Sequence, residues 1–131
     1  MTGDEPIFLK RSQVEQLHDI SLARYGGQAG VREPGLVDSA LASAKNTFFY
    51  GGGDIFDIAA AYAFHIAEAQ AFSDGNKRTA ASAALVFLEL NSIQTTRSEN
   101  ELYSAMIDIA NKQLNKAGLA ELLRSASKSG Q

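Results

Sequence analysis

A polar turn of eight residues, 72–79 (FSDGNKRT), separates two long apolar segments of the chain. A helix that begins within this turn presents free backbone N–H groups and about half a positive charge. Gly75 lets the backbone come close to a ligand, and Asn76 can cap the helix, orient a phosphate oxygen, or both. Lys77 and Arg78 add full positive charge at the same place. These four residues therefore predict a phosphate site.

Asp74 stands directly before these residues and is a hard oxygen ligand. Such a carboxylate beside bound phosphates suits Mg²⁺, which a protein often holds through one carboxylate together with nucleotide phosphates. A purely structural interpretation remains open, because Asp-Gly is a common turn pair and Asn a common helix cap. Two features favour the functional interpretation. Lys77 and Arg78 lie where the helix dipole disfavours cations unless an anion binds, and they precede the most apolar helix of the chain.

The segments on either side of this turn are predicted to be helices. Residues 76–90 are apolar almost all round, which predicts a buried central helix. Apolar spacing predicts a further helix at about 55–71 and others after Ser12, Pro34 and Ser98 and at about 116–125. We therefore expect an all-α fold of about six helices, forming one domain over residues 1–131. The polar ends, 1–6 and 126–131, are expected to be disordered.

Residues 46–54 carry three aromatic residues followed by three glycines, a run that cannot form the interior of a helix. Two interpretations remain open: a loop whose aromatic side chains pack into the core, or a mobile flap beside a site. His65 lies five residues before Gln70, which is about 140° round a helix. We therefore expect His65 to face away from the turn, as a structural histidine, and assign His18 no role.

The composition excludes several classes of function. The 131 residues carry a net charge of −3 and a pI near 5.3, which disfavours a direct nucleic-acid partner or an anionic membrane surface. The chain has no cysteine, so disulfides, thiolate chemistry and cysteine-ligated metals are excluded. No signal peptide or membrane span is visible. A cytoplasmic location is the expectation.

The motif FSDGNKRT resembles the signature of the Fic/Doc family, in particular its Doc (death-on-curing) branch. Segments 17–19 (LHD), 24–27 (RYGG), 33–35 (EPG) and 85–91 (LVFLELN) are similar to the same family in order and spacing. The resemblance covers roughly residues 7–125. It implies the all-α Fic fold.

The resemblance also implies a function. Doc proteins are toxins of toxin–antitoxin systems that use ATP and Mg²⁺ to phosphorylate a threonine of elongation factor Tu, which stops translation. A small antitoxin neutralises them through a C-terminal segment that folds on binding. By position, Asp74 would bind Mg²⁺, Asn76 and the local backbone would bind phosphate, and Lys77 and Arg78 would clamp phosphates. Other Fic proteins transfer AMP. They usually carry Gly at the position of Lys77 and Arg at that of Ala81, so this chain favours Doc-type chemistry.

One departure concerns the catalytic base. The family signature has His where this chain has Gln70, and often Pro where it has Ala71. Gln cannot take a proton as His does, but it can orient a hydroxyl. Three explanations are open: a change introduced to disarm a toxin, a natural variant that works slowly, or an inactive relative that only binds. Two adjacent departures favour natural variation.

Overall fold

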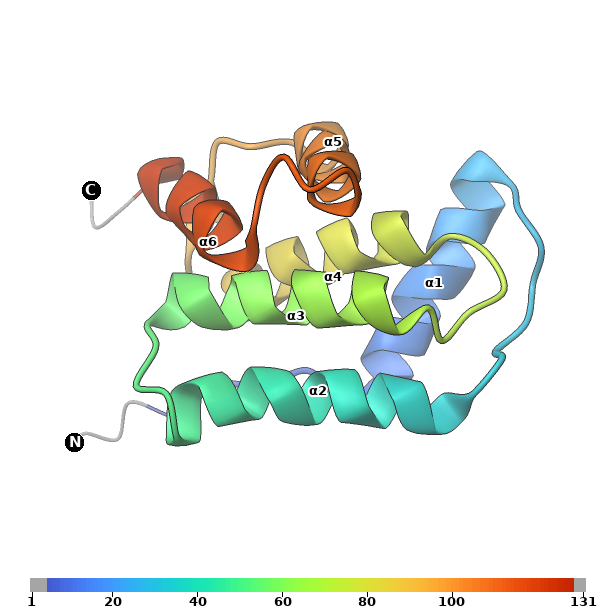
Figure 1. Cartoon of the computed structure of the whole chain (residues 1–131), viewed down its shortest axis with the longest axis horizontal. Helices are drawn as coiled ribbons and strands as arrows, with labels where there is room; N and C mark the ends of the chain where they lie inside the picture. Colours follow the sequence, from blue (N-terminus) through green and yellow to red (C-terminus); the bar gives the residue numbers. More distant parts are fainter. Residues whose placement is uncertain (1–4, 129–131) are drawn as a thin grey trace.

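The computed structural model describes residues 5–128 and shows an all-α fold, as the sequence predicts (Figure 1). Six helices follow one another along the described chain, and two short strands accompany them. The helices are α1 (Arg11–Tyr25), α2 (Pro34–Phe49), α3 (Ile55–Ala69), α4 (Asn76–Leu90), α5 (Glu99–Ala110) and α6 (Lys116–Ser125). The strands are β1 (Gln94–Thr95) and β2 (Ser127–Lys128). No helix of the described chain has the length and apolar character needed to cross a bilayer.

The centre of the fold is the pair α3 and α4. Helix α3 packs on α2, α4 and α6, and α4 packs on α1, α3 and α5. The six consecutive residues 58–63 of α3 are all buried, as are the six residues 79–84 of α4. Alanines dominate both runs and let the helix backbones approach closely. The predicted bounds of 76–90 are confirmed, but α4 shares the central place with α3.

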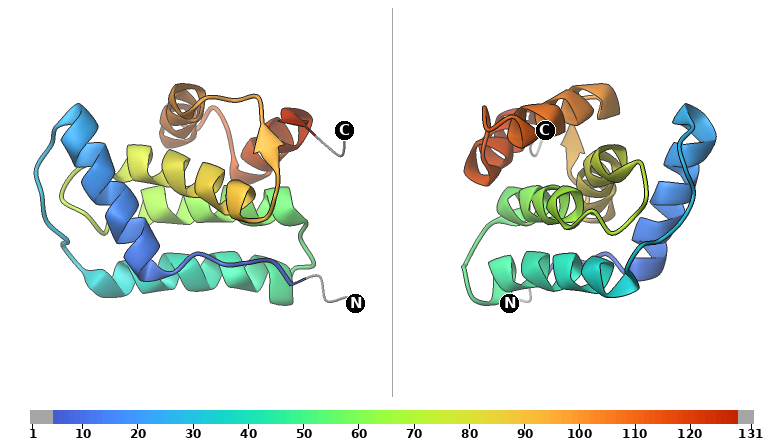
Figure 2. Two further views of the ribbon diagram at one scale, coloured as in Figure 1. Left: turned by 180° about the vertical axis from the view of Figure 1, so that it is seen from behind. Right: turned by 45° about the vertical axis from the view of Figure 1, so that its right-hand side comes forward.

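The loops that connect the first four helices lie at the two opposite ends of the α3–α4 pair. Residues 70–75, which we call the motif loop, join α3 to α4 at one end, and the connection from α1 to α2 crosses beside them (Figures 1 and 2). The α2–α3 connection lies at the other end. The flap interpretation of residues 46–54 is therefore wrong, since this segment does not border the motif loop. The loop interpretation is wrong for residues 46–49, which form the end of α2. Of the three aromatic side chains, only Phe48 packs against the core, because Phe49 and Tyr50 are 51% and 86% exposed.

Helix boundaries and faces differ from the prediction at two places that matter for the site. Helix α3 ends at Ala69, and Gln70 takes a left-handed conformation with φ 50°. Gln70 is thus outside the helix that the sequence extends to about residue 71. In α1, helical spacing predicts a buried stripe of Val14, Leu17 and either Ile20 or Ser21. The buried residues are Val14, His18 and Ser21, and Ile20 is 43% exposed.

The C-terminal segment is more ordered than its polar composition suggests. Ser127 and Lys128 pair antiparallel with Thr95 and Gln94, and Ala126 is buried. The expected disorder of residues 126–131 is therefore wrong for residues 126–128. The expectations for residues 1–4 and 129–131 fall outside the described residues.

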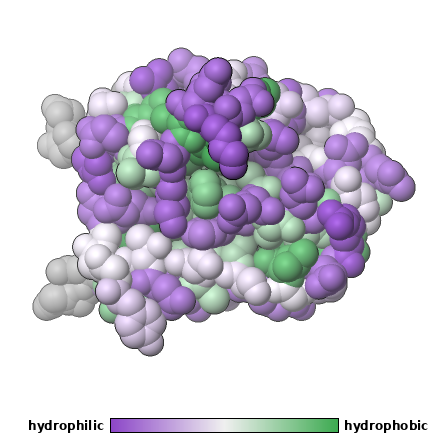
Figure 3. Space-filling model, in the orientation of Figure 1, coloured by the Kyte–Doolittle hydropathy of each residue, from purple (hydrophilic) through white to green (hydrophobic). Residues whose placement is uncertain are grey.

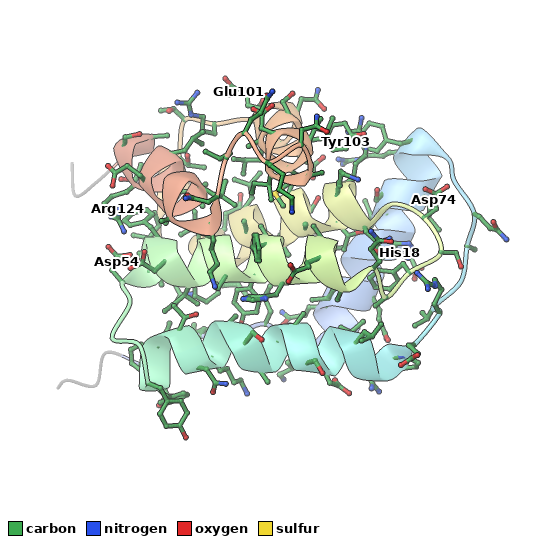
Figure 4. All side chains as sticks on the ribbon, in the orientation of Figure 1. His18, Asp54, Asp74, Glu101, Tyr103 and Arg124 are labelled. Atoms are coloured by element: carbon green, nitrogen blue, oxygen red, sulfur yellow. The ribbon has the colours of Figure 1, made fainter. Side chains whose placement is uncertain are left out.

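An ion-pair network fixes α6 to the beginning of α3. The Arg124 guanidinium donates to Asp54 through Nε and Nη2, both at 3.0 Å, and also contacts Asp57 and Glu121. Partial burial opposes ionisation of Asp54, but the hydrogen bonds and charge of Arg124 prevail and lower the pKa of Asp54 below its ordinary value. Figure 4 shows Arg124 and Asp54 at the end of the molecule opposite Asp74.

Candidate active site

The motif loop leads into the N-terminal end of α4. Gly75 is the residue before the helix and has φ 77°, a left-handed conformation that favours glycine. The backbone N–H groups of residues 76–78 have no hydrogen-bond partner within residues 5–128. Three donors therefore point out of the helix at its positive end, where an anion would be stabilised.

The Asn76 side chain fastens the motif loop to itself. Its Oδ1 accepts the Phe72 N–H at 3.2 Å, and its Nδ2 donates to the Phe72 carbonyl at 3.0 Å. Phe72 is buried, so this pair of bonds ties the loop to the core. The structure thus gives Asn76 a loop-holding role in place of the predicted side-chain cap. Its contact with phosphate stays a prediction.

The Asp74 carboxylate is held in place by backbone donors. Its Oδ1 accepts the Gly75 N–H at 3.0 Å, and its Oδ2 accepts the Gln28 N–H at 3.2 Å. Each oxygen keeps a further lone pair. No cluster of three metal-ligating side chains exists in the described chain. A lone, oriented carboxylate fits Mg²⁺ that takes its remaining ligands from phosphates and water, and does not fit a metal site made by the protein alone.

A loop from the α1–α2 connection, residues 26–33, braces the motif loop. Val31 and Phe72 form an isolated antiparallel bridge, and the Ser73 N–H donates to the Gly30 carbonyl at 3.0 Å. Arg32 donates its N–H to the Ala71 carbonyl at 2.7 Å and its Nη1 to the Gln70 carbonyl at 3.1 Å. These contacts fix the backbone of the motif loop, and the Gln28 N–H of the same bracing loop holds the Asp74 side chain.

All six predicted site residues line one open cavity of about 390 Å³. The complete lining consists of Ser21, Tyr25, Gly26, Gly27, Ala67, Gln70, Ser73, Asp74, Gly75, Asn76, Lys77, Arg78 and Tyr103. A second cavity of about 310 Å³ adjoins it along α5 and shares Ala67, Gln70 and Lys77 with it. Hydrophilic residues cover most of the face in Figure 3, with hydrophobic atoms visible between them. The structure thus brings the predicted residues together, and their binding roles stay predictions.

His65 lies where the sequence predicts, whereas His18, to which the sequence assigns no role, lies beside the motif loop. His65 is half-buried away from both cavities, with its Nε2 3.1 Å from the Lys116 Nζ, which agrees with a structural role. Burial and the Lys116 cation lower the pKa of His65, and Glu68 opposes them. His18, assigned no role from sequence, is 2% exposed and hydrogen-bonds through Nε2 to the Asp74 carbonyl at 2.7 Å.

His18 also stacks on the motif loop. Its ring lies 3.9 Å from the Phe72 ring, centroid to centroid, with an interplanar angle of 11°. Because a carbonyl accepts, Nε2 must carry the proton. The available sequence signal was slight: His18 follows Val14 by four residues, which places both on one face of α1. Tyr25 and Tyr103, which line the cavity, were also missed as site residues.

A helix N-terminus with free backbone N–H groups, an oriented carboxylate and a braced loop are parts expected of a Fic-type site. The model of the Fic/DOC family matches residues 8–88, so the chain belongs to this family. The chain is 33% identical over 109 residues to "Protein kinase doc" of Escherichia phage P1, covering 82% of this chain and 86% of that protein. It is 42% identical over 74 residues to "Toxin Doc" of Mycolicibacterium smegmatis, covering 53% and 55%.

Proposed function

We propose that this chain is a Doc-type toxin, a phosphotransferase that moves the γ-phosphoryl group of ATP onto a protein hydroxyl. The observation that carries this proposal is the cavity in which Asp74, Lys77, Arg78 and three unpaired backbone N–H groups face one space. The relative named "Protein kinase doc", which aligns over most of both chains, supports phosphate rather than AMP as the transferred group.

Each site residue has a part in this reaction. The N–H groups of residues 76–78 receive the phosphate oxygens, and Lys77 and Arg78 add charge there. Asp74 holds Mg²⁺, which when bound neutralises charge on the phosphates. Gln70, at the rim between the two cavities, orients the acceptor hydroxyl by hydrogen bonding. Phosphoryl transfer depends mostly on positioning and electrostatics, so a site without a histidine base retains slow activity.

Two radioactive labels test the proposal. The purified protein is incubated with cell lysate and Mg²⁺ and either γ-labelled or α-labelled ATP. We expect γ-label on a protein, more of it with Gln70→His, and none with Asp74→Ala. The absence of γ-label in every case, Gln70→His included, would refute phosphotransfer, whereas α-label on the target would show AMP transfer instead.

The acceptor and the partner follow from the same proposal. We propose a threonine of elongation factor Tu as the acceptor, which makes the chain an inhibitor of translation in the cytoplasm. The proposed partner is a cognate antitoxin with a disordered C-terminal segment. Mass spectrometry of the labelled protein tests the acceptor. A gene for a small, partly disordered protein next to this one would support the partner.

Gln70 favours a second candidate, a catalytically silent Doc-like module that keeps the fold and its antitoxin surface. Its side chain lacks a group that titrates near neutral pH. This candidate predicts that the unaltered protein binds an antitoxin segment but transfers no label from ATP to a protein. Label transfer by the unaltered protein at the rate of Gln70→His would refute it.

A further inference from the structure

Arg78 lies between two tyrosine rings that come from distant parts of the chain. Its Cζ is 3.6 Å from the centroid of the Tyr25 ring, at the end of α1, and 4.0 Å from that of Tyr103, on α5. Both rings line the same cavity as Arg78. Contacts this short place the guanidinium against each ring face, an arrangement favoured by the negative charge of those faces.

Hydrogen bonds around Arg78 and its two tyrosine rings give this arrangement a defined geometry. Nη1 of Arg78 donates to Asn100 Oδ1 at 3.4 Å, which occupies one of its donors. Glu99 accepts from the Tyr25 hydroxyl at 3.5 Å and also from the Ser82 hydroxyl. Arg24 lies 3.8 Å from the same carboxylate. Helices α1, α4 and α5 are thereby joined beside Arg78.

We propose that Tyr25 and Tyr103 are positioning residues that hold Arg78 for binding the terminal phosphates of the nucleotide. A guanidinium is planar and offers its donors only in that plane. With rings against its faces, Arg78 can meet an oxyanion only through its remaining N–H edge, in a bidentate geometry. The rings also restrict the rotamers of a long side chain, so less entropy is lost on binding.

This inference rests on the proposed function, because it gives Arg78 a phosphate to bind. The inference goes beyond the proposed function by assigning a positioning role to two residues that act through Arg78 and do not touch the ligand. Tyr103 could instead stack directly on the nucleotide base. The two possibilities differ in two respects. A positioning residue loses its effect when Arg78 is absent, and a base-stacking residue does not. A positioning residue affects both MgATP and tripolyphosphate, whereas a base-stacking residue affects only MgATP.

A double-mutant cycle separates these possibilities. Dissociation constants for MgATP and for inorganic tripolyphosphate with Mg²⁺ are measured by calorimetry for the unaltered protein, Tyr103→Leu, Arg78→Ala and the double variant. We expect Tyr103→Leu to weaken both ligands about three- to tenfold, as loss of a cation–π contact implies. In the Arg78→Ala background the same change should alter neither constant more than about twofold.

Three controls accompany the cycle. Tyr103→Phe keeps the ring and should bind like the unaltered protein, and Tyr50→Leu makes the matched change on an exposed residue far from the site. Tyr25→Leu, at a half-exposed position, should reproduce the Tyr103→Leu result and serves if Tyr103→Leu does not fold. Thermal unfolding monitors folding in each case.

The outcomes distinguish the inference from the proposed function. If Tyr103→Leu weakens MgATP equally with and without Arg78, or leaves both ligands unchanged, the inference is wrong while the proposed function stands. If the unaltered protein binds neither MgATP nor tripolyphosphate, the proposed function fails and the inference fails with it.

Discussion

Gly27 gives a sharp test of the Asp74 geometry. It lies in the bracing loop with φ 123°, and a Cβ added there would be 3.1 Å from Asp74 Oδ2 and 3.0 Å from Leu22 Cδ2. Ordinary contacts begin at 3.4 Å, so Gly27→Ala must displace the carboxylate by about 0.3 Å. Gly26 is the matched control: it also has positive φ, 78°, but an added Cβ would meet nothing within 4 Å.

Both substitutions strain the backbone, and each should lower the free energy of unfolding by about 1–3 kcal/mol. Only Gly27→Ala disturbs Asp74. Because Mg²⁺ demands near-ideal ligand distances, a carboxylate shifted by about 0.3 Å should weaken Mg²⁺-dependent ATP binding by roughly three- to tenfold.

The assay compares ATP affinity in Mg²⁺ with that in EDTA for the two alanine variants, alongside urea denaturation. The ratio of the ATP affinity in Mg²⁺ to that in EDTA measures the part of ATP binding that depends on the metal. We expect this ratio to fall in Gly27→Ala and to stay unchanged in Gly26→Ala. Equal ratios in the two variants would refute the reasoning that the bracing loop sets the position of Asp74.

Three further predictions concern the scaffold. His18→Phe keeps an aromatic ring but leaves the Asp74 carbonyl without its donor, and should lower the unfolding free energy in urea by about 1–3 kcal/mol; an unchanged midpoint would contradict this. Since the pKa of His65 is lowered from 6.5 in the folded state, its contribution to stability is complete at higher pH and is lost as pH falls through that value. His65→Gln should therefore flatten the decline in thermal stability between pH 7 and pH 5, and an identical profile would count against a lowered pKa of His65. Arg124→Gln should cost about 1 kcal/mol of unfolding free energy, because its acidic partners are partly exposed, and 1 M salt should reduce that loss; a loss that salt leaves unaltered would point to packing.

The sequence predicted the helices well where apolar spacing and caps agree. The bounds of α4 and α6 follow from the apolar run at residues 76–90 and from the apolar spacing at residues 116–125. The structure adds that Asn115 caps α6 by accepting the Gly118 N–H. The residue at which α3 ends was harder to predict from the sequence. An alanine-rich segment contains no stop signal, and only the tertiary pairing of the motif loop with residues 30–33 requires the left-handed turn at Gln70.

The same limit applies to the site. A compact motif such as residues 72–79 can be recognised from the sequence, because residues adjacent in sequence are also close in space. Tyr103 and His18 come from helices distant in sequence, so their place beside the motif loop depends on how α1 and α5 pack on α4. Helical spacing places His18 on the same face as Val14, but it does not identify the carbonyl that the ring contacts.

The most direct test of the central claim is whether the motif loop binds nucleotide phosphates together with Mg²⁺. Calorimetric titration with ATP compares the unaltered protein with Asp74→Ala, Lys77→Ala and Asp108→Ala, an exposed acid on α5 that serves as the control. We predict Mg²⁺-dependent binding that Asp74→Ala and Lys77→Ala each weaken about tenfold or more and Asp108→Ala leaves unchanged. Equal ATP affinity in all four proteins, with or without Mg²⁺, would contradict the account.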